Sequence, residues 1–398
     1  MTLPEPIPHT EAQARLLAMA EPLGTETLAT AEAAGRYLTA TLHARRSQPA
    51  ADLSAMDGYA VCENDLEGPW QVVGESAAGH PFGGALQAGQ AVRISTGALM
   101  PEGGDAVLIQ ENAVRNGDTL SLSGEDGPTK RHIRRKGFDF KAGDALLEAG
   151  QRVGPAQIAL ALSGGLASLP VGRLPRVAVI DCGDELSADP QSCQPHQLPA
   201  SNGAMLLAMV RGEVAECVQI GPVPDEPAAL QNALDQAGDV DVIVTSGGAS
   251  VGDHDLIRPA LQSWGAKLGF WRVAMKPGKP LLVAQKGRQI VLGLPGNPVS
   301  AFVTAHIFLL PILRRLAGAE KPLPPVTMLP LGVAMPQVGK RAEFVRGQMG
   351  PDGVVPLGEQ DSSALLSLSS AEMLIVRLRG ATAAKQGEMV PAHWLHNG

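Results

Sequence analysis

Four polar, glycine-rich segments in the second half of the chain contain residues that could bind an anionic ligand together with a metal ion. The first, Asp181 to Leu186, places the adjacent carboxylates of Asp184 and Glu185 after an apolar run. Carboxylate oxygens are the ligands that Mg²⁺ prefers, although an acid pair in such a turn also serves to cap a helix. The second, Thr245 to Asp255, is rich in small residues whose backbone N–H groups can approach an anion closely.

The other two segments contain cationic residues or a helix start. Lys276 and Lys279 flank a stiff Pro-Gly turn, and this pair suits a phosphate or a tetrahedral oxyanion, although an exposed turn would have the same composition. Asn297 and Pro298 occupy positions typical of a helix N-cap and first turn, which serves an anion site or a purely structural cap. Together the four segments predict an anionic, phosphorylated ligand bound with a metal.

The elements around these segments determine whether they meet. Apolar strands are expected at 176–180, 240–245 and 289–294, alternating with helices at 200–211, 255–264 and 299–317. Near-continuous apolar strands with crossover helices indicate a parallel sheet covered on both faces. Ligands of such sheets bind at the carboxyl ends of the strands, which is where all four segments would lie.

The rest of the chain has a different pattern. Thr10 and Gln13 resemble a capping box that opens a helix running to about Ala20, and further helices are expected at 31–43 and from Gly154-Pro155 onward. Between them, short apolar runs separated by glycine and proline turns indicate a β-rich insertion. A short β-rich domain is expected after residue 325.

Composition excludes several classes of function. A net charge of −8 argues against nucleic acid or an anionic membrane as the main partner. The basic run at 130–136 is either a solvated loop or a contact with an anionic ligand. The four cysteines lack zinc-site spacing, the first residues lack a signal-peptide pattern, and His306 and Pro311 interrupt the longest apolar stretch. These features predict a cytoplasmic protein.

Similarity to a known family rests on three further motifs. Residues 54–60, Ser-Ala-Met-Asp-Gly-Tyr-Ala, resemble a signature of the molybdopterin molybdenumtransferase family (MoeA type), which includes the carboxy-terminal domain of gephyrin. Residues 93–98 with 101–103, and residues 134–137 with Asp139, also resemble family motifs. The four segments described above follow in family order, and the similarity extends beyond residue 375.

The resemblance implies an α/β multidomain fold. Its expected parts are a discontinuous helical domain (1–54 and 143–174), an inserted β-rich domain (55–142), an α/β molybdopterin-binding domain with a parallel sheet (175–318) and a C-terminal β-barrel-like domain (319–398). It also implies an elongated homodimer, in which each cleft joins the parallel-sheet domain of one subunit to the inserted domain of the other. Further expected partners are a molybdopterin adenylyltransferase and apo-molybdoenzymes or their chaperones.

The implied reaction belongs to molybdenum cofactor biosynthesis. Molybdate is inserted into adenylylated molybdopterin, AMP is released, and Mg²⁺ is the cofactor. The expected catalytic residues are Asp57, Asp139, Glu185, Asp225, Asp255, Lys276 and Lys279, of which Glu185 and Asp255 would hold the metal. The expected binding residues are Thr96, Gly97, Gly183, Asp184, Ser246, Gly247, Gly248, Ser250, Pro295, Gly296, Asn297, Pro298 and Ser300.

Four positions depart from the family pattern. Leu53 stands where Asn is common, Phe138 where Glu is frequent, and Asp181-Cys182 where a pair of small hydroxyl residues is usual. Ala200 takes the place of a frequent Asp before Ser-Asn. Two alternatives therefore stay open: a diverged non-catalytic carrier or scaffold for the cofactor, and a molybdopterin adenylyltransferase, which shares the parallel-sheet domain.

Overall fold

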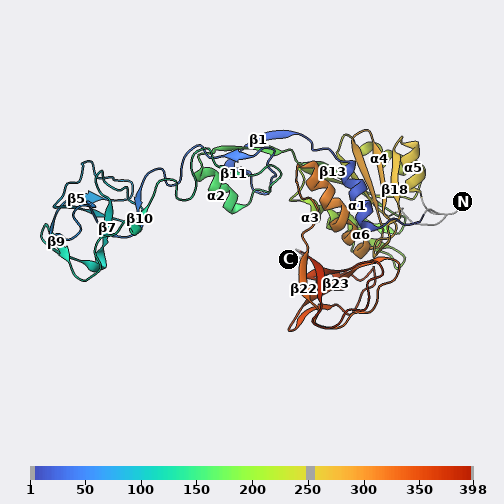
Figure 1. Ribbon diagram of the computed structural model, residues 1–398. Coiled ribbons are helices and arrows are strands. Elements are labelled where there is room, and N and C mark those ends of the chain that lie inside the picture. Colours follow the sequence, from blue (N-terminus) through green and yellow to red (C-terminus); the bar gives the residue numbers. More distant parts are fainter. Residues whose placement is uncertain (1–4, 248–255, 396–398) are drawn as a thin grey trace.

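The chain forms an elongated molecule with domains spaced along its length (Figure 1). The structure is a computed structural model that describes residues 5–247 and 256–395. A β-rich domain lies at one end, a slender middle part carries helix α2, and the other end holds the α/β sheet with the C-terminal β domain beside it. The chain passes twice through the middle part, on the way to the β-rich domain and on the way back.

The domain at the far end is a six-stranded sheet of strand order β7-β4-β6-β5-β9-β8. All its neighbouring strands are antiparallel except β5 and β6. The buried Trp70 indole fills its core and donates to the Asp65 carbonyl at 3.0 Å. The strands are β3 (Leu53–Ser54), β4 (Gly58–Val61), β5 (Trp70–Ser76), β6 (Gln90–Ile94), β7 (Ala106–Ile109), β8 (Ala113–Asn116), β9 (Thr119–Leu122) and β10 (Ile133–Arg134), with β3 paired to β10.

The middle part joins two distant segments of the sequence. Strand β1 (Thr25–Ala29) pairs with β12 (Ser168–Gly172), and β2 (Leu42–His43) pairs with β11 (Ala145–Leu147). Helix α2 (Pro155–Ser163) begins at the predicted proline. The helix predicted at 31–43 is wrong: the segment contains one short 3-10 turn, after which Gly35 adopts a φ of +82° and the chain continues in extended bridges.

Helix α1 (His9–Ala18) begins after Pro8, and no side chain caps it. The predicted capping box is therefore wrong. The helix buries Ala12 and Leu16 in the core of the α/β domain, where it contacts α7 (Leu310–Leu316), instead of packing against α2.

The α/β domain contains a six-stranded sheet of order β16-β13-β17-β21-β20-β18. The first four strands are parallel, as predicted, whereas β20 runs antiparallel to them because a tight turn at Gly287 folds it back onto β21. The edge strand β18 pairs antiparallel with β20 and therefore runs in the same direction as the first four. The strands are β13 (Arg176–Cys182), β16 (Glu216–Val223), β17 (Val242–Ser246), β18 (Lys267–Trp271), β20 (Leu282–Lys286) and β21 (Gln289–Leu294).

Helices cover both faces of this sheet because side chains alternate between the faces along each strand. Val177 and Val179 share one core with α1, α3 (Ser201–Val210) and α6 (Pro298–Thr304). Ala178 and Ile180 share the other with α4 (Pro227–Gln236) and α5 (Ile257–Ser263). A π-helical turn at Ala305–Leu309 links α6 to α7. This continuous helix is long and apolar enough to cross a membrane, but 83% of its apolar window is buried as core.

The C-terminal domain is a β sheet whose first strand comes from the preceding domain. Its strand order is β19-β23-β25-β26-β22, and β19 (Met275–Lys276) pairs with the start of β23. The remaining elements are β22 (Thr327–Pro330), β23 (Ala342–Gly350), β24 (Gly353–Pro356), α8 (Leu365–Ser369), β25 (Met373–Arg377) and β26 (Met389–Trp394). The β-rich terminal domain predicted from the sequence is confirmed.

Candidate functional site

A cavity of about 620 Å³ lies at the carboxyl ends of β13, β17 and β21. This is the ligand side of a parallel sheet. Three of the four predicted segments reach it directly, and the segment containing the two lysines reaches it through Pro280. Its wall includes Asp181, Cys182, Glu185, Ala200, Ser201, Asn202, Ser246, Gly247, Pro280, Pro295, Gly296, Asn297, Pro298, Ser363 and Leu365.

The acidic segment after β13 turns sharply at Gly183. This glycine has a φ of +150°, and a Cβ added there would lie 2.4 Å from Glu185 Oε2. The positive φ favours glycine at this position, and the exposed Glu185 side chain folds over the turn. Asp184 Oδ1 accepts the backbone N–H of Asp225 at 3.0 Å. The structure thus brings the backbone of Asp225 into contact with the Asp184–Glu185 pair, from which it is distant in the sequence.

An asparagine that the site prediction omitted joins two of the segments. Asn202 Nδ2 donates to Ser246 Oγ at 2.8 Å and to the Gly296 carbonyl at 2.7 Å. Asn202 was noted only as a neighbour of Ala200. Its place in the first turn of a helix that follows a parallel strand could have identified it, because such helices begin at the carboxyl edge of the sheet.

The glycine after β17 is also required by close contact. Gly247 has a φ of +92°, and a Cβ there would lie 2.1 Å from the Cys182 carbonyl oxygen. Gly248, Ser250 and Asp255 lie outside the described residues, so their predicted roles stay predictions.

Asn297 is the N-cap residue of α6, as predicted, but its side chain does not cap the helix. Its Nδ2 instead donates to Ser362 Oγ at 2.9 Å, and the Val299 N–H donates to the Ser362 carbonyl at 3.1 Å. The C-terminal domain therefore contributes to the wall through Ser362 and Ser363, which no sequence motif indicated.

The two lysines line an adjoining hollow of about 480 Å³, which also contains Ser300 and Arg341. Within the part of the chain that the structure describes, neither Lys276 nor Lys279 forms an ion pair. Gly278, at the turn between them, has a φ of +101°. Two unpaired ammonium groups beside a cavity favour an anion there.

A buried arginine holds the loop on the other side of this hollow. Arg346 is 1% exposed, and its guanidinium donates to the carbonyls of Glu359, Asp361 and Ala364 at 3.0, 2.9 and 3.0 Å. Arg346 thereby fixes the loop carrying Ser362 and Ser363 to strand β23 of the C-terminal sheet, and the hydrogen bonds of Ser362 join that loop to the α/β domain.

The predicted residues of the inserted domain form a second, separate group. Asp57 Oδ1 accepts the Thr96 N–H at 2.6 Å, and this hydrogen bond lowers the pKa of Asp57. The Gly97 N–H donates to the Ser54 carbonyl at 2.8 Å, and the Asp139 N–H donates to the Gln48 carbonyl at 2.9 Å. Asp57 directly precedes β4 and Thr96 follows β6, in the sheet that also contains β5, β7 and β9 and that lies at the opposite end of the molecule from the α/β sheet (Figure 1). Asp139 follows β10, on the segment that returns from this domain. One chain does not bring the two groups together.

Magnesium is compatible with the acidic segment. Among residues 5–247 and 256–395, no three His, Cys, Asp or Glu side chains form a ready metal cage. Mg²⁺ in nucleotide sites rarely needs one, because it uses one or two carboxylates together with phosphates and water. The exposed Glu185 beside the Asp184–Asp225 contact offers such a donor set. Burial, with added repulsion from nearby acids, raises the pKa of the Cys182 thiol to about 12, so this cysteine is not a reactive group.

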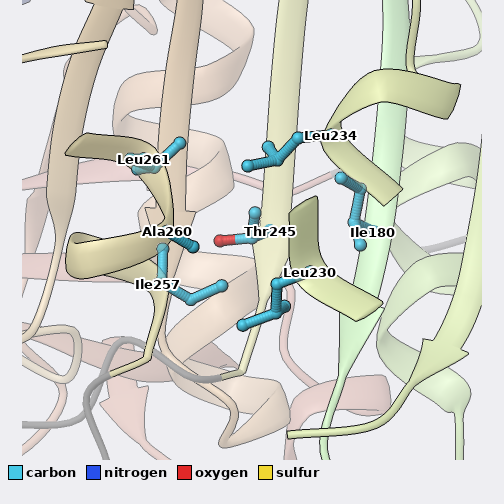
Figure 2. A pocket seen from close by; sticks show the side chains of 7 residues that line it. All are labelled: Ile180, Leu230, Leu234, Thr245, Ile257, Ala260 and Leu261. Carbon is cyan, nitrogen blue, oxygen red and sulfur yellow. The ribbon is translucent and has the colours of Figure 1, made fainter. Parts of the chain in front are cut away.

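A small gap behind β17 has no such chemistry. Figure 2 shows the Thr245 hydroxyl among aliphatic side chains of α4, α5 and β13, around a space of about 10 Å³. Thr245 Oγ1 has no hydrogen-bond partner among the described residues. The gap is a packing defect beneath the site and too small for an organic ligand.

Sequence comparison identifies three known regions in this order along the chain. The MoeA N-terminal region (domain I and II) matches residues 7–165. A domain described as "Probable molybdopterin binding domain" matches residues 178–315, and the MoeA C-terminal region (domain IV) matches residues 328–395.

Whole-length relatives agree with these matches. The molybdopterin molybdenumtransferase of Nostoc sp. is 36% identical over 373 residues, 89% of this chain and 85% of the relative. That of Haemophilus influenzae is 34% identical over 378 residues, 93% of each chain. A crystal structure of the molybdopterin biosynthesis MoeA protein from Pyrococcus horikoshii superposes with a TM-score of 0.84 at 25% identity, covering 98% of this chain and 100% of that chain.

Proposed function

The chain belongs to the molybdopterin molybdenumtransferase (MoeA) family, and we propose that it inserts molybdate into adenylylated molybdopterin with release of AMP in a Mg²⁺-dependent reaction. Its place in molybdenum cofactor biosynthesis follows from relatives of the same name that align over nearly its whole length. The observation that best supports the finer proposal is the cavity at the carboxyl edge of the parallel strands, with two unpaired lysines beside it.

The charges of the site match the charges of the proposed substrates. Adenylylated molybdopterin carries a phosphoanhydride and molybdate is an oxyanion, so both need cationic or N–H donors. Lys276 and Lys279 would hold these anionic groups, and Ser300 with the start of α6 would lie against molybdate. Gly247 and the Asn202–Ser246–Gly296 contacts would shape the pocket for the organic part of the substrate.

The carboxylates would hold the magnesium ion and orient the reacting groups. Glu185 is the proposed metal ligand together with Asp255, which lies outside the described residues, and Asp225 is held close by Asp184. When bound, Mg²⁺ would neutralise charge on the pyrophosphate and act as a Lewis acid. In the overall change water adds across the phosphoanhydride bond, so that AMP leaves and the other phosphate stays on the pterin. Oxo ligands of molybdate are exchanged for the dithiolene sulfurs of the substrate and leave as water, with protons from the dithiol and the solvent.

The site would be completed by a second copy of the chain. The sheet that contains β4 and β6, beside Asp57 and Thr96, lies at the far end of the molecule from the α/β sheet (Figure 1), so in an elongated homodimer the inserted domain of one subunit, with Asp139 after its β10, would cover the cavity of the other. Light scattering should then give about twice the chain mass of 41.3 kDa.

Mixing inactive variants tests the shared cleft directly. Asp57→Ala and Lys279→Ala chains should each be inactive alone. Subunits exchanged between them should regain activity, because one of the two mixed clefts then contains no substitution. A mixture of Lys276→Ala with Lys279→Ala is the matched control and should stay inactive, since every cleft contains a substituted sheet domain. Equal recovery in both mixtures, or in neither, contradicts the shared cleft.

The activity itself is tested by AMP release from adenylylated molybdopterin with Mg²⁺, with and without molybdate. Molybdate-dependent release that also activates an apo-molybdoenzyme would support the transferase. Tight binding without release would point to a carrier, and transfer of AMP from ATP to molybdopterin would point to an adenylyltransferase.

Proposed partners are the adenylyltransferase that supplies the substrate and the apo-molybdoenzymes, or their chaperones, that receive the product. The free thiols support a cytoplasmic location.

A further inference from the structure

The carboxyl group of Asp181 is buried in the cavity wall, at the end of β13. Asp181 is 0% exposed, and its Oδ2 accepts Gln219 Nε2 at 2.8 Å. Its Oδ1 has no hydrogen-bond partner among the described residues. Burial raises the pKa of this carboxyl, and hydrogen bonds from Gln219 and the Gly203 amide partly oppose that change. A buried acid with an unused oxygen costs free energy, so its presence calls for a specific role.

Helix α3 begins beside this carboxyl and lacks an ordinary cap. Its N-cap residue is Ala200, and no side chain from the N-cap position makes a capping hydrogen bond. The Asp181 carboxyl lies against the first turn of the helix instead. A Cβ added to Gly203 would lie 2.1 Å from Asp181 Oδ2, and the Gly203 amide is one of the donors to this carboxyl. A negative charge there also favours the helix dipole.

The first turn of α3 positions a residue of the site. Asn202 directly precedes Gly203, and its amide ties Ser246 to Gly296 across the cavity. A shift of the first turn would move this amide and loosen both loops. The contact between Asp181 and Gly203 is therefore one step away from the residues that shape the pocket.

We propose that Asp181 is a positioning residue, which caps α3 from the neighbouring strand and thereby fixes Asn202 in the wall of the cavity. Its effect on turnover rests on the proposed function, whereas its effect on the helix does not. An aspartate at position 200 would supply the same carboxylate from the usual N-cap position. The two positions, 181 and 200, should therefore be able to exchange this role.

A stability experiment tests the contact without any substrate. Gly203→Ala in the otherwise unchanged chain should lower the midpoint of thermal unfolding by about 5 °C, because the new methyl group collides with Asp181. In an Asp181→Ser background the same change should be neutral, since the collision is removed, the Gln219 side chain is free to move, and alanine favours a helix over glycine. Equal destabilisation in both backgrounds would overturn the proposal.

A kinetic experiment tests the positioning. Asp181→Ser should raise KM for adenylylated molybdopterin about fivefold, the loss expected for one helix cap. Adding Ala200→Asp should return KM to within about twofold of the starting value. Asp239→Ser is the matched control, because Asp239 is a fully exposed acid before β17, at the other end of the sheet. An unchanged KM in Asp181→Ser, or no recovery with Ala200→Asp, would overturn the proposal. If the unchanged chain releases no AMP, the proposed function fails, and the thermal experiment still decides the capping contact.

Discussion

Replacing Asn202 by alanine should lower kcat/KM, an effect that its modest cost to the stability of the fold does not by itself explain. The substitution removes two hydrogen bonds, to Ser246 Oγ at 2.8 Å and to the Gly296 carbonyl at 2.7 Å. Ser246 is only 2% exposed, so its hydroxyl would lose a partner that water cannot easily replace, at a cost of about 1.5 kcal/mol. Gly296 is exposed, so water can replace that bond at about 0.5 kcal/mol.

These two losses come to about 2 kcal/mol, which corresponds to roughly a 30-fold change in an equilibrium constant. If the preformed loops are what the substrate binds, kcat/KM for adenylylated molybdopterin should fall by about that factor. Steady-state AMP release at several substrate concentrations measures it, and thermal unfolding reports the stability of the same samples.

The chain offers a matched control in Gln289. Its amide also makes two hydrogen bonds to loop atoms, to the carbonyls of Gly238 and Val240 at 2.7 and 2.9 Å, but at the opposite end of the sheet. Gln289→Ala should reduce stability to a similar extent and leave kcat/KM unchanged. The reasoning is refuted if both variants lower kcat/KM equally, or if Asn202→Ala leaves it unchanged.

Three other predictions concern the charges and the backbone. Glu185→Ala and Lys279→Ala should each lower turnover at least about 100-fold with an unchanged melting temperature, because both side chains lie at the surface of the site and neither is part of a core; wild-type rates would remove them from the site. Gly172→Ala should lower the free energy of unfolding by about 3 kcal/mol in denaturant titration, because the new Cβ would lie 2.0 Å from the backbone carbonyl oxygen of Ala317. A neutral result would contradict this close approach. The hydrogen bond to Asp57 lowers its pKa below the unfolded value, so its stabilising contribution is present above that unfolded value and is lost as pH falls through the folded value. NMR titration should show that Asp57 has a pKa below that of an ordinary aspartate, and a carboxyl that titrates at or above the ordinary value would contradict the contact.

The α/β domain was largely predictable because its strands are short, apolar and regularly spaced. The strand predicted at 176–180 is β13, the strand predicted at 289–294 is β21, and the helix predicted at 200–211 is α3. Buried parallel strands leave this pattern in the sequence because both of their faces must be apolar. The reversed strand β20 was not distinguished, since strand direction depends on a turn and not on hydrophobicity.

Local patterns failed where distant segments decide the structure. The segment 31–43 has a helical composition, but its backbone pairs with residues near 152 and 171, which follow the inserted domain. Thr10 and Gln13 have capping-box spacing, yet α1 begins at His9 and is held by its packing on the α/β core. Tertiary contacts override weak local preferences in both places.

In the site, too, some residues could be predicted from the neighbouring sequence, whereas others depend on contacts with distant segments. Glycines 183 and 247 could be predicted as part of the site because they lie in polar, glycine-rich segments that directly follow apolar strands. The structure shows that Gly247 is required by the close approach of the Cys182 carbonyl and that Gly183 adopts a positive φ. Ser362 could not, because the serine lies in another domain and reaches Asn297 only after the C-terminal sheet has formed. The sequence shows Asp181 and Ala200 as two separate departures from the family pattern. Only the structure places both residues at the start of one helix, α3.

Strand β19 has a consequence for how the molecule loses its structure. Because Met275 and Lys276 pair with Ala342 and Glu343, Lys276 of the proposed anion site lies in the edge strand of the C-terminal sheet. Melting of that sheet would release β19 and Lys276 together. The last domain should therefore open, and the affinity for oxyanion should be lost, in one cooperative step. When oxyanion is bound, the free energy that opens these strands to hydrogen exchange would then be at least as large as the free energy of oxyanion binding.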